Sequence, residues 1–157
     1  MRRKDFLKTA SLLLSYPFFS SCKQLSEKTF SFKKGRVRIT TRIYELHLRQ
    51  TWTLSRGSWS TRRNLLVRLE KDGVVGYGEA APIARYHESA ESNQALVEKA
   101  LPILEKDLWA YQERWTELDR LSPGENAAKA ALDLAILDWV TKSLKIPLHR
   151  FFGLDKE

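Results

Sequence analysis

The histidines and acidic residues of this 157-residue chain are the side chains best suited to hold a metal ion or to transfer a proton. His47, His87 and His149 each lack a cysteine or a second histidine at the spacing that metal ligands need. Asp133 and Asp138 lie five residues apart in a stretch with helical periodicity, so they occupy different helix faces. We interpret these two acids as ion-pair or capping groups and the three histidines as isolated side chains.

The run of residues 72–82 indicates a turn, a short glycine-rich strand and a stop signal. Its first two residues are Asp-Gly, which favours a hairpin turn because glycine tolerates positive φ. Gly76 and Gly78 leave one face of the following strand bare, which suits the close approach of another backbone. Pro82 ends the pairing because it has no N–H to donate.

The periodicity of apolar residues predicts an α+β fold, in which a three-stranded antiparallel meander precedes a three-helix cluster. The expected strands span residues 37–48, 63–70 and 74–78, and the expected helices span residues 89–104, 107–121 and 126–144. We expect Pro102 to kink or split the first helix. The last helix carries a stripe of mostly small residues, which lets a neighbouring element pack closely.

Several motifs agree in order and spacing with one known family. They are DG..G.GE..P at residues 72–82, Y.ES at 86–89, ALDLAILDW at 131–139 and P...FFG at 147–153. Together they resemble the N-terminal capping domain of the enolase superfamily, in its mandelate racemase and muconate-lactonizing branch. Within that branch the resemblance is to dipeptide epimerases of the L-Ala-D/L-Glu type, because TWTLSRGS and GEAAP occur together. The domain that resembles the family spans residues 37–155.

The resemblance implies an enzyme that abstracts the proton next to a carboxylate, with lysine bases and a Mg²⁺ ion held by three acidic residues. In the family these groups belong to a C-terminal barrel, which needs about 200 or more residues. This sequence stops where that barrel would begin, and it contains neither a Lys-x-Lys element nor a matching acidic triad. We therefore assign no catalytic residue and no metal ligand. We expect the chain alone to be inactive, as a truncated or split part of a Mg²⁺-dependent enzyme.

The capping domain of the family contributes specificity through two loops that fold over the mouth of the barrel. The first corresponds to residues 51–60, where Arg56 is the candidate to pair a carboxylate of a dipeptide, because a guanidinium matches a carboxylate bidentately. The alternative is an exposed loop arginine without such a role. Trp52 would wall the pocket, although a loop tryptophan also packs on its own sheet.

The second loop corresponds to residues 83–89, where Arg85 and Tyr86 are the candidates for contact with the substrate. Glu79 precedes this loop, and the family uses that position mostly in a structural role. The resemblance implies a dipeptide substrate such as the Ala-Glu of murein. The alternatives are another racemase or cycloisomerase of the superfamily, and a stand-alone lipoprotein without catalytic activity. Association into a homo-oligomer stays open.

The net charge of +8 comes from the N-terminal end of the chain. Residues 1–38 hold ten lysines and arginines against two acidic residues, whereas residues 39–157 hold seventeen of each. The folded part therefore has no basic excess, which argues against nucleic-acid binding. Residues 23–36 are polar and basic without a sustained period, so we expect a flexible linker there, suited to an anionic lipid surface.

Residues 1–22 have the pattern of an export signal. Their basic start is followed by an apolar stretch, residues 9–21, that is shorter than the ~20 residues of a membrane span. The basic start resembles a twin-arginine motif, with the general export route as the alternative. Phe-Ser-Ser-Cys resembles a bacterial lipoprotein cleavage box, so Cys22 is the candidate lipidated residue of a periplasmic, membrane-anchored protein. An incidental thiol is the alternative, since this is the only cysteine and forms no internal disulfide.

Overall fold

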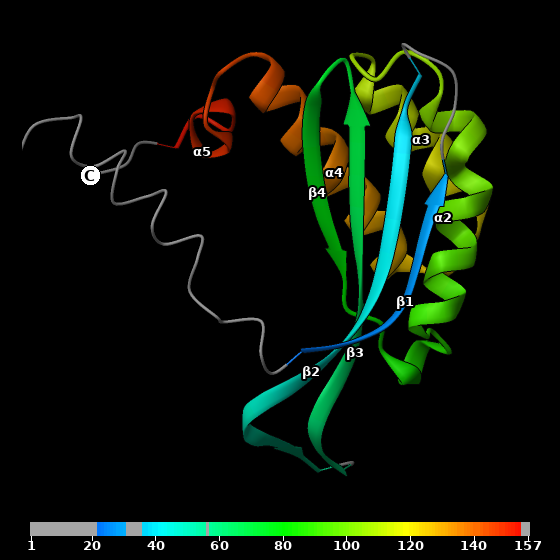
Figure 1. The fold of residues 1–157 in the computed structure, drawn as a ribbon, viewed down its shortest axis with the longest axis vertical. Helices are drawn as coiled ribbons and strands as arrows, with labels where there is room; N and C mark the ends of the chain where they lie inside the picture. The colour runs from blue at the N-terminus through cyan, green and yellow to red at the C-terminus, as the bar shows by residue number, and fades with distance from the viewer. Residues whose placement is uncertain (1–21, 31–35, 56, 155–157) are drawn as a thin grey trace, which may run out of the picture.

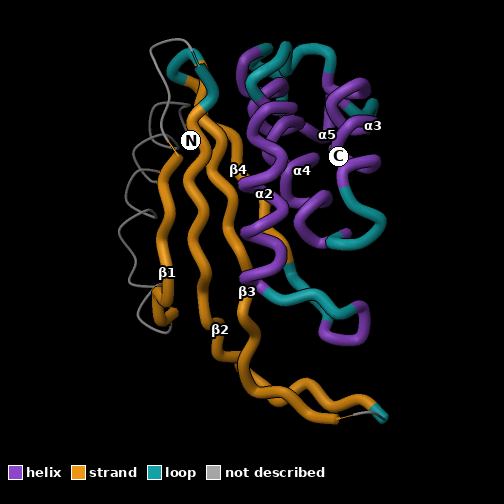
Figure 2. Tube along the Cα trace, turned by 90° about the vertical axis from the view of Figure 1, so that its right-hand side faces the viewer, coloured by secondary structure: helices purple, strands orange, loops and turns teal. Residues whose placement is uncertain are grey.

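The computed structural model describes residues 22–30, 36–55 and 57–154. One antiparallel sheet with the strand order β1-β2-β3-β4 forms a layer, and the helices pack against one of its faces (Figures 1 and 2). The elements are β1 (Cys22–Phe30), β2 (Arg38–Leu54), β3 (Gly57–Lys71), β4 (Val74–Ala80), η1 (Ala84–Tyr86), α2 (Ala90–Leu104), α3 (Tyr111–Leu121), α4 (Asn126–Ser143) and α5 (Leu148–Phe151). The meander of β2, β3 and β4 followed by helices confirms the predicted α+β class.

The strand β1 is an addition to the predicted meander. It occupies most of the stretch 23–36, so the expectation of a flexible linker there is corrected for residues 23–30. β1 pairs with β2 in antiparallel fashion between Cys22 and Phe30, with a register shift between Gln24 and Ser26. Lys28 on β1 also reaches α2, where its ammonium lies 2.7 Å from a carboxylate oxygen of Glu98. Pairing with an edge strand satisfies backbone groups without any apolar period, which is why the residue pattern does not indicate this strand.

The helices begin and end close to their predicted limits. α2 continues through Pro102 to Leu104, so the proline does not split the helix. Pro102 lies in the last turn, where the loss of one backbone hydrogen bond is tolerated because the helix ends two residues later. α3 begins at Tyr111 rather than at 107, because the carboxylate of Asp107 accepts the backbone N–H of Trp109 at 3.0 Å and forms a turn instead. In the ranges that the structure describes, no helix is long and apolar enough to cross a membrane.

The hydrophobic core lies between the inner face of the sheet and the helices. Alternate residues of β2 and β3 point into it, as the period of a strand requires. The most deeply buried of these are Ile39, Ile43, Leu65, Val67 and Leu69. The facing helix residues are Val97, Ala100, Leu104, Leu132, Ile136 and Trp139. Each large side chain buried in this way stabilises the fold by about 1.5–3 kcal/mol.

The contact between β4 and α4 is closer than side chains would permit. A Cβ atom added at Gly78 would lie 1.9 Å from the carbonyl oxygen of Ala131, and one added at Gly76 would lie 2.1 Å from that of Ala135. Both distances are far below van der Waals contact, so only glycine fits at either position. The two glycines of the 72–82 motif therefore set the distance between the sheet and its longest helix.

Side chains of α4 also bond to the backbone of the β3–β4 hairpin. Asp138 accepts the N–H of Tyr77 at 2.8 Å, and the ammonium of Lys142 donates to the carbonyl of Val75 at 3.1 Å. The indole N–H of Trp139 donates to the carbonyl of Lys71 at 3.1 Å. β4 is an edge strand, and free backbone groups along such a strand can pair with another chain. The side chains of Asp138 and Lys142 bond to two of these groups on β4 and so make them unavailable for such pairing.

We predict that Gly78→Ala lowers the free energy of unfolding by about 3 kcal/mol or more, because its methyl group would collide with the backbone of α4. Gly124→Ala is the matched control, since a Cβ atom at Gly124 meets nothing within 4 Å. The control should change stability by less than about 0.5 kcal/mol. Urea unfolding monitored by tryptophan fluorescence measures both. Equal stability of the two variants would contradict the close contact.

Candidate functional site

Two segments project beyond the same end of the sheet. Leu65 of β3 pairs with Ala80, the last residue of β4, so β4 ends beside the middle of β3. The β2–β3 hairpin extends past this end, and the loop of residues 81–89 leaves from it (Figure 1). In Figure 2 the tip of the hairpin curves toward the side of the sheet that the helices occupy. This end is where the two candidate loops of the sequence come together.

The first of these segments is a β-ribbon rather than the polar loop that the sequence predicts for residues 51–60. β2 continues to Leu54 and β3 begins at Gly57, after a register shift between His47 and Trp52. Trp52 pairs across the strands with Trp59 and keeps 56% of its surface exposed. The exposed indole is therefore available to a ligand at this end of the sheet.

Other contacts stiffen the ribbon. The hydroxyls of Thr53 and Ser58 lie 2.9 Å apart across the strands. The guanidinium carbon of Arg62 lies 4.8 Å from the ring centroid of Trp59, which is a cation–π contact that the sequence analysis did not anticipate. Arg56, the candidate carboxylate partner, lies outside the described residues. Its role stays a prediction.

The second segment contains η1 and exposes the two other candidates. Arg85 and Tyr86 are both exposed, and the guanidinium carbon of Arg85 lies 5.8 Å from the centroid of the Tyr86 ring. The backbone N–H of Tyr86 donates to Ile83 at 2.8 Å, and that of His87 donates to Ala84 at 3.0 Å. A cation and a phenol therefore stand next to each other on a short turn, where they suit recognition of an anionic group.

Two glutamates flank this segment, and both have structural partners. Glu79 accepts a hydrogen bond from the side-chain amide of Asn64 at 2.7 Å, in agreement with a structural role. Glu88 is buried, and its carboxylate accepts the backbone N–H of Asn126 at 2.7 Å and that of Ala127 at 3.4 Å. The sequence analysis did not single out Glu88. A contact across 38 residues leaves no local pattern that could indicate it.

The acidic residues and histidines do not assemble a metal centre in the described part of the chain. No group of three His, Cys, Asp or Glu side chains there is arranged to hold a metal ion, so these residues do not fit Mg²⁺. Asp138 is already bonded to the N–H of Tyr77 and to Lys142 at 2.6 Å. Asp133 is partly buried on α4, and its burial raises the pKa of its carboxyl group above the ordinary value.

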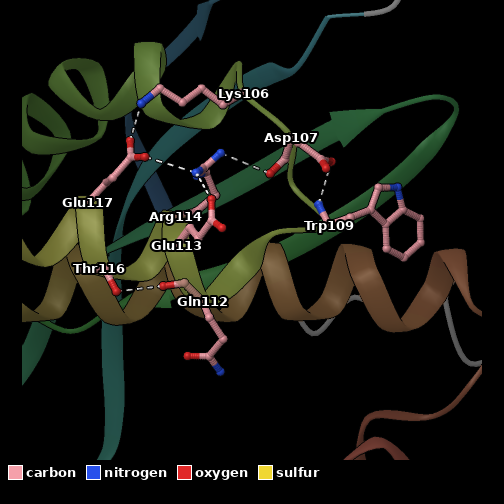
Figure 3. Close-up of polar contacts among 8 residues, drawn as sticks. All are labelled: Lys106, Asp107, Trp109, Gln112, Glu113, Arg114, Thr116 and Glu117. Carbon is pink, nitrogen blue, oxygen red and sulfur yellow. Dashed lines mark hydrogen bonds and ion pairs between the residues drawn. The ribbon is translucent and has the colours of Figure 1, made fainter.

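A second polar cluster joins α3 to the turn that precedes it (Figure 3). The buried guanidinium of Arg114 lies 3.0 Å from the carboxylate of Glu113 and 3.1 Å from that of Glu117. Lys106 donates to Glu117 at 2.5 Å, and this bond is the main reason why the pKa of Glu117 lies below its ordinary value. Arg114 also reaches the backbone carbonyl of Asp107 at 3.4 Å. The charges compensate one another, so we interpret the cluster as a structural ion-pair network.

We predict that Asp133→Asn raises the melting temperature at pH 7. A carboxyl whose pKa is raised by folding destabilises the protein above its unfolded pKa, and the penalty disappears below that value, about 3.9. The gain should therefore shrink as the pH falls through the folded pKa and vanish below the unfolded one. Thermal unfolding of both proteins between pH 3 and pH 7 measures it. A gain of the same size at every pH would rule out titration of Asp133 as its cause.

Comparison with known proteins identifies the domain. Residues 37–153 match the family model of the mandelate racemase / muconate lactonizing enzyme N-terminal domain. This stretch is well over half of the chain. The chain therefore belongs to this family of the enolase superfamily, and the described fold is its N-terminal domain.

Individual relatives agree with this assignment. The L-Ala-D/L-Glu epimerase of Bacteroides thetaiotaomicron is 32% identical over 163 residues, covering 99% of this chain and 43% of the relative. The solved dipeptide epimerase of Methylococcus capsulatus, in complex with Mg and L-Arg-D-Lys, is 27% identical with a TM-score of 0.70, covering 75% of this chain and 35% of that one. The N-succinyl Arg/Lys racemase of Bacillus cereus is 29% identical with a TM-score of 0.70, covering 80% and 35%. The chain thus spans less than half the length of these proteins.

Proposed function

We propose that this chain supplies the substrate-facing N-terminal domain of a dipeptide epimerase-like enzyme. The observation that carries the proposal is geometric. The β2–β3 ribbon and the loop of residues 81–89 project beyond one end of the sheet, where Trp52, Arg85 and Tyr86 are exposed. The names of the relatives, which include L-Ala-D/L-Glu epimerase and dipeptide epimerase, support a dipeptide as that ligand.

In this proposal the four candidate residues have two roles in recognition. A guanidinium forms two parallel hydrogen bonds with a carboxylate, so Arg56 and Arg85 would pair the carboxylates of a dipeptide. Trp52 and Tyr86 would offer flat apolar surfaces to the rest of the molecule. The described residues provide no metal cluster. We therefore place the Mg²⁺ ligands and the proton-transferring residues in the part of the relatives that this chain does not cover, and we expect the chain alone to be inactive.

A racemase that acts on another carboxylate substrate is the second candidate. The N-succinyl Arg/Lys racemase shares the fold at a similar identity, which supports this candidate, whereas more of the relatives are named epimerases of dipeptides. A non-catalytic lipoprotein would need neither the carboxylate-binding arginines nor a partner domain. The DNA sequence downstream of these 157 codons distinguishes the lipoprotein from the two enzymes. An adjoining region that encodes a barrel supports an enzyme, and its absence supports the lipoprotein.

The arginines can be tested in a chimera that joins this domain to the remaining part of the Bacteroides thetaiotaomicron relative. Arg56→Ala should raise KM for acidic dipeptides by about tenfold, because a charge-assisted hydrogen bond is worth about 1.5–3 kcal/mol. The effect on kcat should be small if the arginine binds substrate and transition state equally. Initial rates with Ala-Glu and with a neutral dipeptide measure the difference.

Arg120→Ala is the matched control, since Arg120 lies on α3 and is exposed. It should leave KM unchanged for both substrates. A rise in KM of the same size for acidic and neutral dipeptides would count against pairing of a substrate carboxylate. An active chimera that accepts only N-succinyl amino acids would favour the second candidate.

We also propose that the protein is exported and anchored to a membrane through Cys22. Because β1 begins at Cys22, an anchor at that residue would hold the sheet close to the lipid surface without a long tether. Cys22→Ser should move the protein from the membrane fraction to the soluble fraction of a bacterial host and abolish incorporation of radiolabelled palmitate. Unchanged fractionation and labelling would mean that this cysteine carries no lipid.

A further inference from the structure

The N-terminal ends of α2 and α4 are linked by two glutamates, each of which precedes one helix and bonds to the other. Glu88 stands just before Ser89, the N-cap of α2, yet its carboxylate accepts the N–H groups of Asn126 and Ala127 in the first turn of α4. Glu125 is the N-cap residue of α4, yet its carboxylate accepts the hydroxyl of Ser92 in α2 at 3.0 Å. Each helix therefore receives the acid that precedes the other.

The two helices depend on these bonds to different degrees. α2 has a complete capping box of its own, in which the side chains of Ser89 and Ser92 each bond to the other's backbone N–H. The N-cap residue of α4, Glu125, has a left-handed backbone with φ of 57° and makes no side-chain cap bond to its own helix. The first N–H groups of a helix have no partner within the helix. Glu88 supplies the missing acceptor for α4, where the helix dipole also favours a negative charge.

The hydrogen bonds from Glu88 to α4 also hold the loop that carries Arg85 and Tyr86. These residues lie only three and two positions before Glu88, on η1, which buries none of its side chains. The left-handed backbone of His87, with φ of 60°, connects η1 to Glu88. With no buried side chain in η1, its placement depends on its two backbone hydrogen bonds and on the point where Glu88 attaches to α4.

We infer that Glu88 is a positioning residue, which holds the exposed Arg85 and Tyr86 in place by anchoring their loop to the first turn of α4. The anchoring itself is a property of this chain. Its consequence for substrate binding rests on the function proposed above.

Hydrogen–deuterium exchange of the full 157-residue chain tests the anchoring without any substrate. The probes are the amides of Tyr86 and His87, whose hydrogen bonds close the η1 turn. Glu88→Ala should speed their exchange about tenfold or more, while amides in the middle of β3 change much less. Glu88→Gln keeps a side-chain oxygen as acceptor and should restore most of the protection. If Glu88→Ala does not fold, Glu88→Asp replaces it, because its shorter side chain withdraws the carboxylate from α4 and should also speed the exchange of these two amides.

Ser92→Ala is the matched control. It removes the hydroxyl that bonds to Glu125 and to the backbone of Ser89, but it leaves the bonds from Glu88 to α4 intact. The control should lower the melting temperature without faster exchange at Tyr86 and His87. If Ser92→Ala loosens these two amides as much as Glu88→Ala does, or if removing or withdrawing the Glu88 carboxylate leaves their exchange unchanged, the inference is wrong.

The chimera then separates anchoring from function. Glu88→Ala should raise KM with a smaller change in kcat, and Glu88→Gln should recover most of the affinity. Faster loop exchange together with an unchanged KM would keep the anchoring and refute the proposed role of the loop in substrate binding. Unchanged exchange together with a raised KM would refute the anchoring instead.

Discussion

The backbone contact between β4 and α4 is the constraint on which the rest of the domain depends. Gly76 and Gly78 place the strand directly against the carbonyl groups of Ala135 and Ala131. At this distance Asp138 reaches a backbone N–H of the strand, which a larger separation would prevent. The distance between α4 and the sheet is therefore set by the two glycines, which have no side chains. Polar contacts such as the one from Asp138 then hold the helix in this position.

The position of α4 in turn determines the end of the molecule that carries the candidate site. The first turn of α4 receives the carboxylate of Glu88, so the loop after β4 is attached to the helix that β4 itself holds. The β2–β3 ribbon leaves from the same end because Leu65 and Ala80 pair there. A single packing contact thus contributes to the placement of both projecting segments. In the proposed role of these segments, such preorganisation would leave less loop ordering to the binding step.

The polar groups of the domain differ in what they can do. The charges of Lys106 and Arg114 are compensated by Glu113 and Glu117 in a network that fixes a turn. Arg85 and Tyr86 contact each other but expose their outer surfaces, so they keep capacity to bind a further group. This contrast, together with the family to which the chain belongs, favours the projecting end of the sheet over the more heavily charged α3 as the candidate site.

The sequence by itself determined the meander, the three long helices and the family, because alternating apolar residues, helical periodicity and the paired glycines are local patterns. Only the tertiary structure decided that residues 22–30 join the sheet, that residues 51–60 form a ribbon, and that Glu88 caps a helix 38 residues away. Each of these depends on which backbone groups come to lie opposite each other. A hydrogen bond to a distant backbone requires no particular neighbours in the chain, and so the order of residues alone does not reveal it.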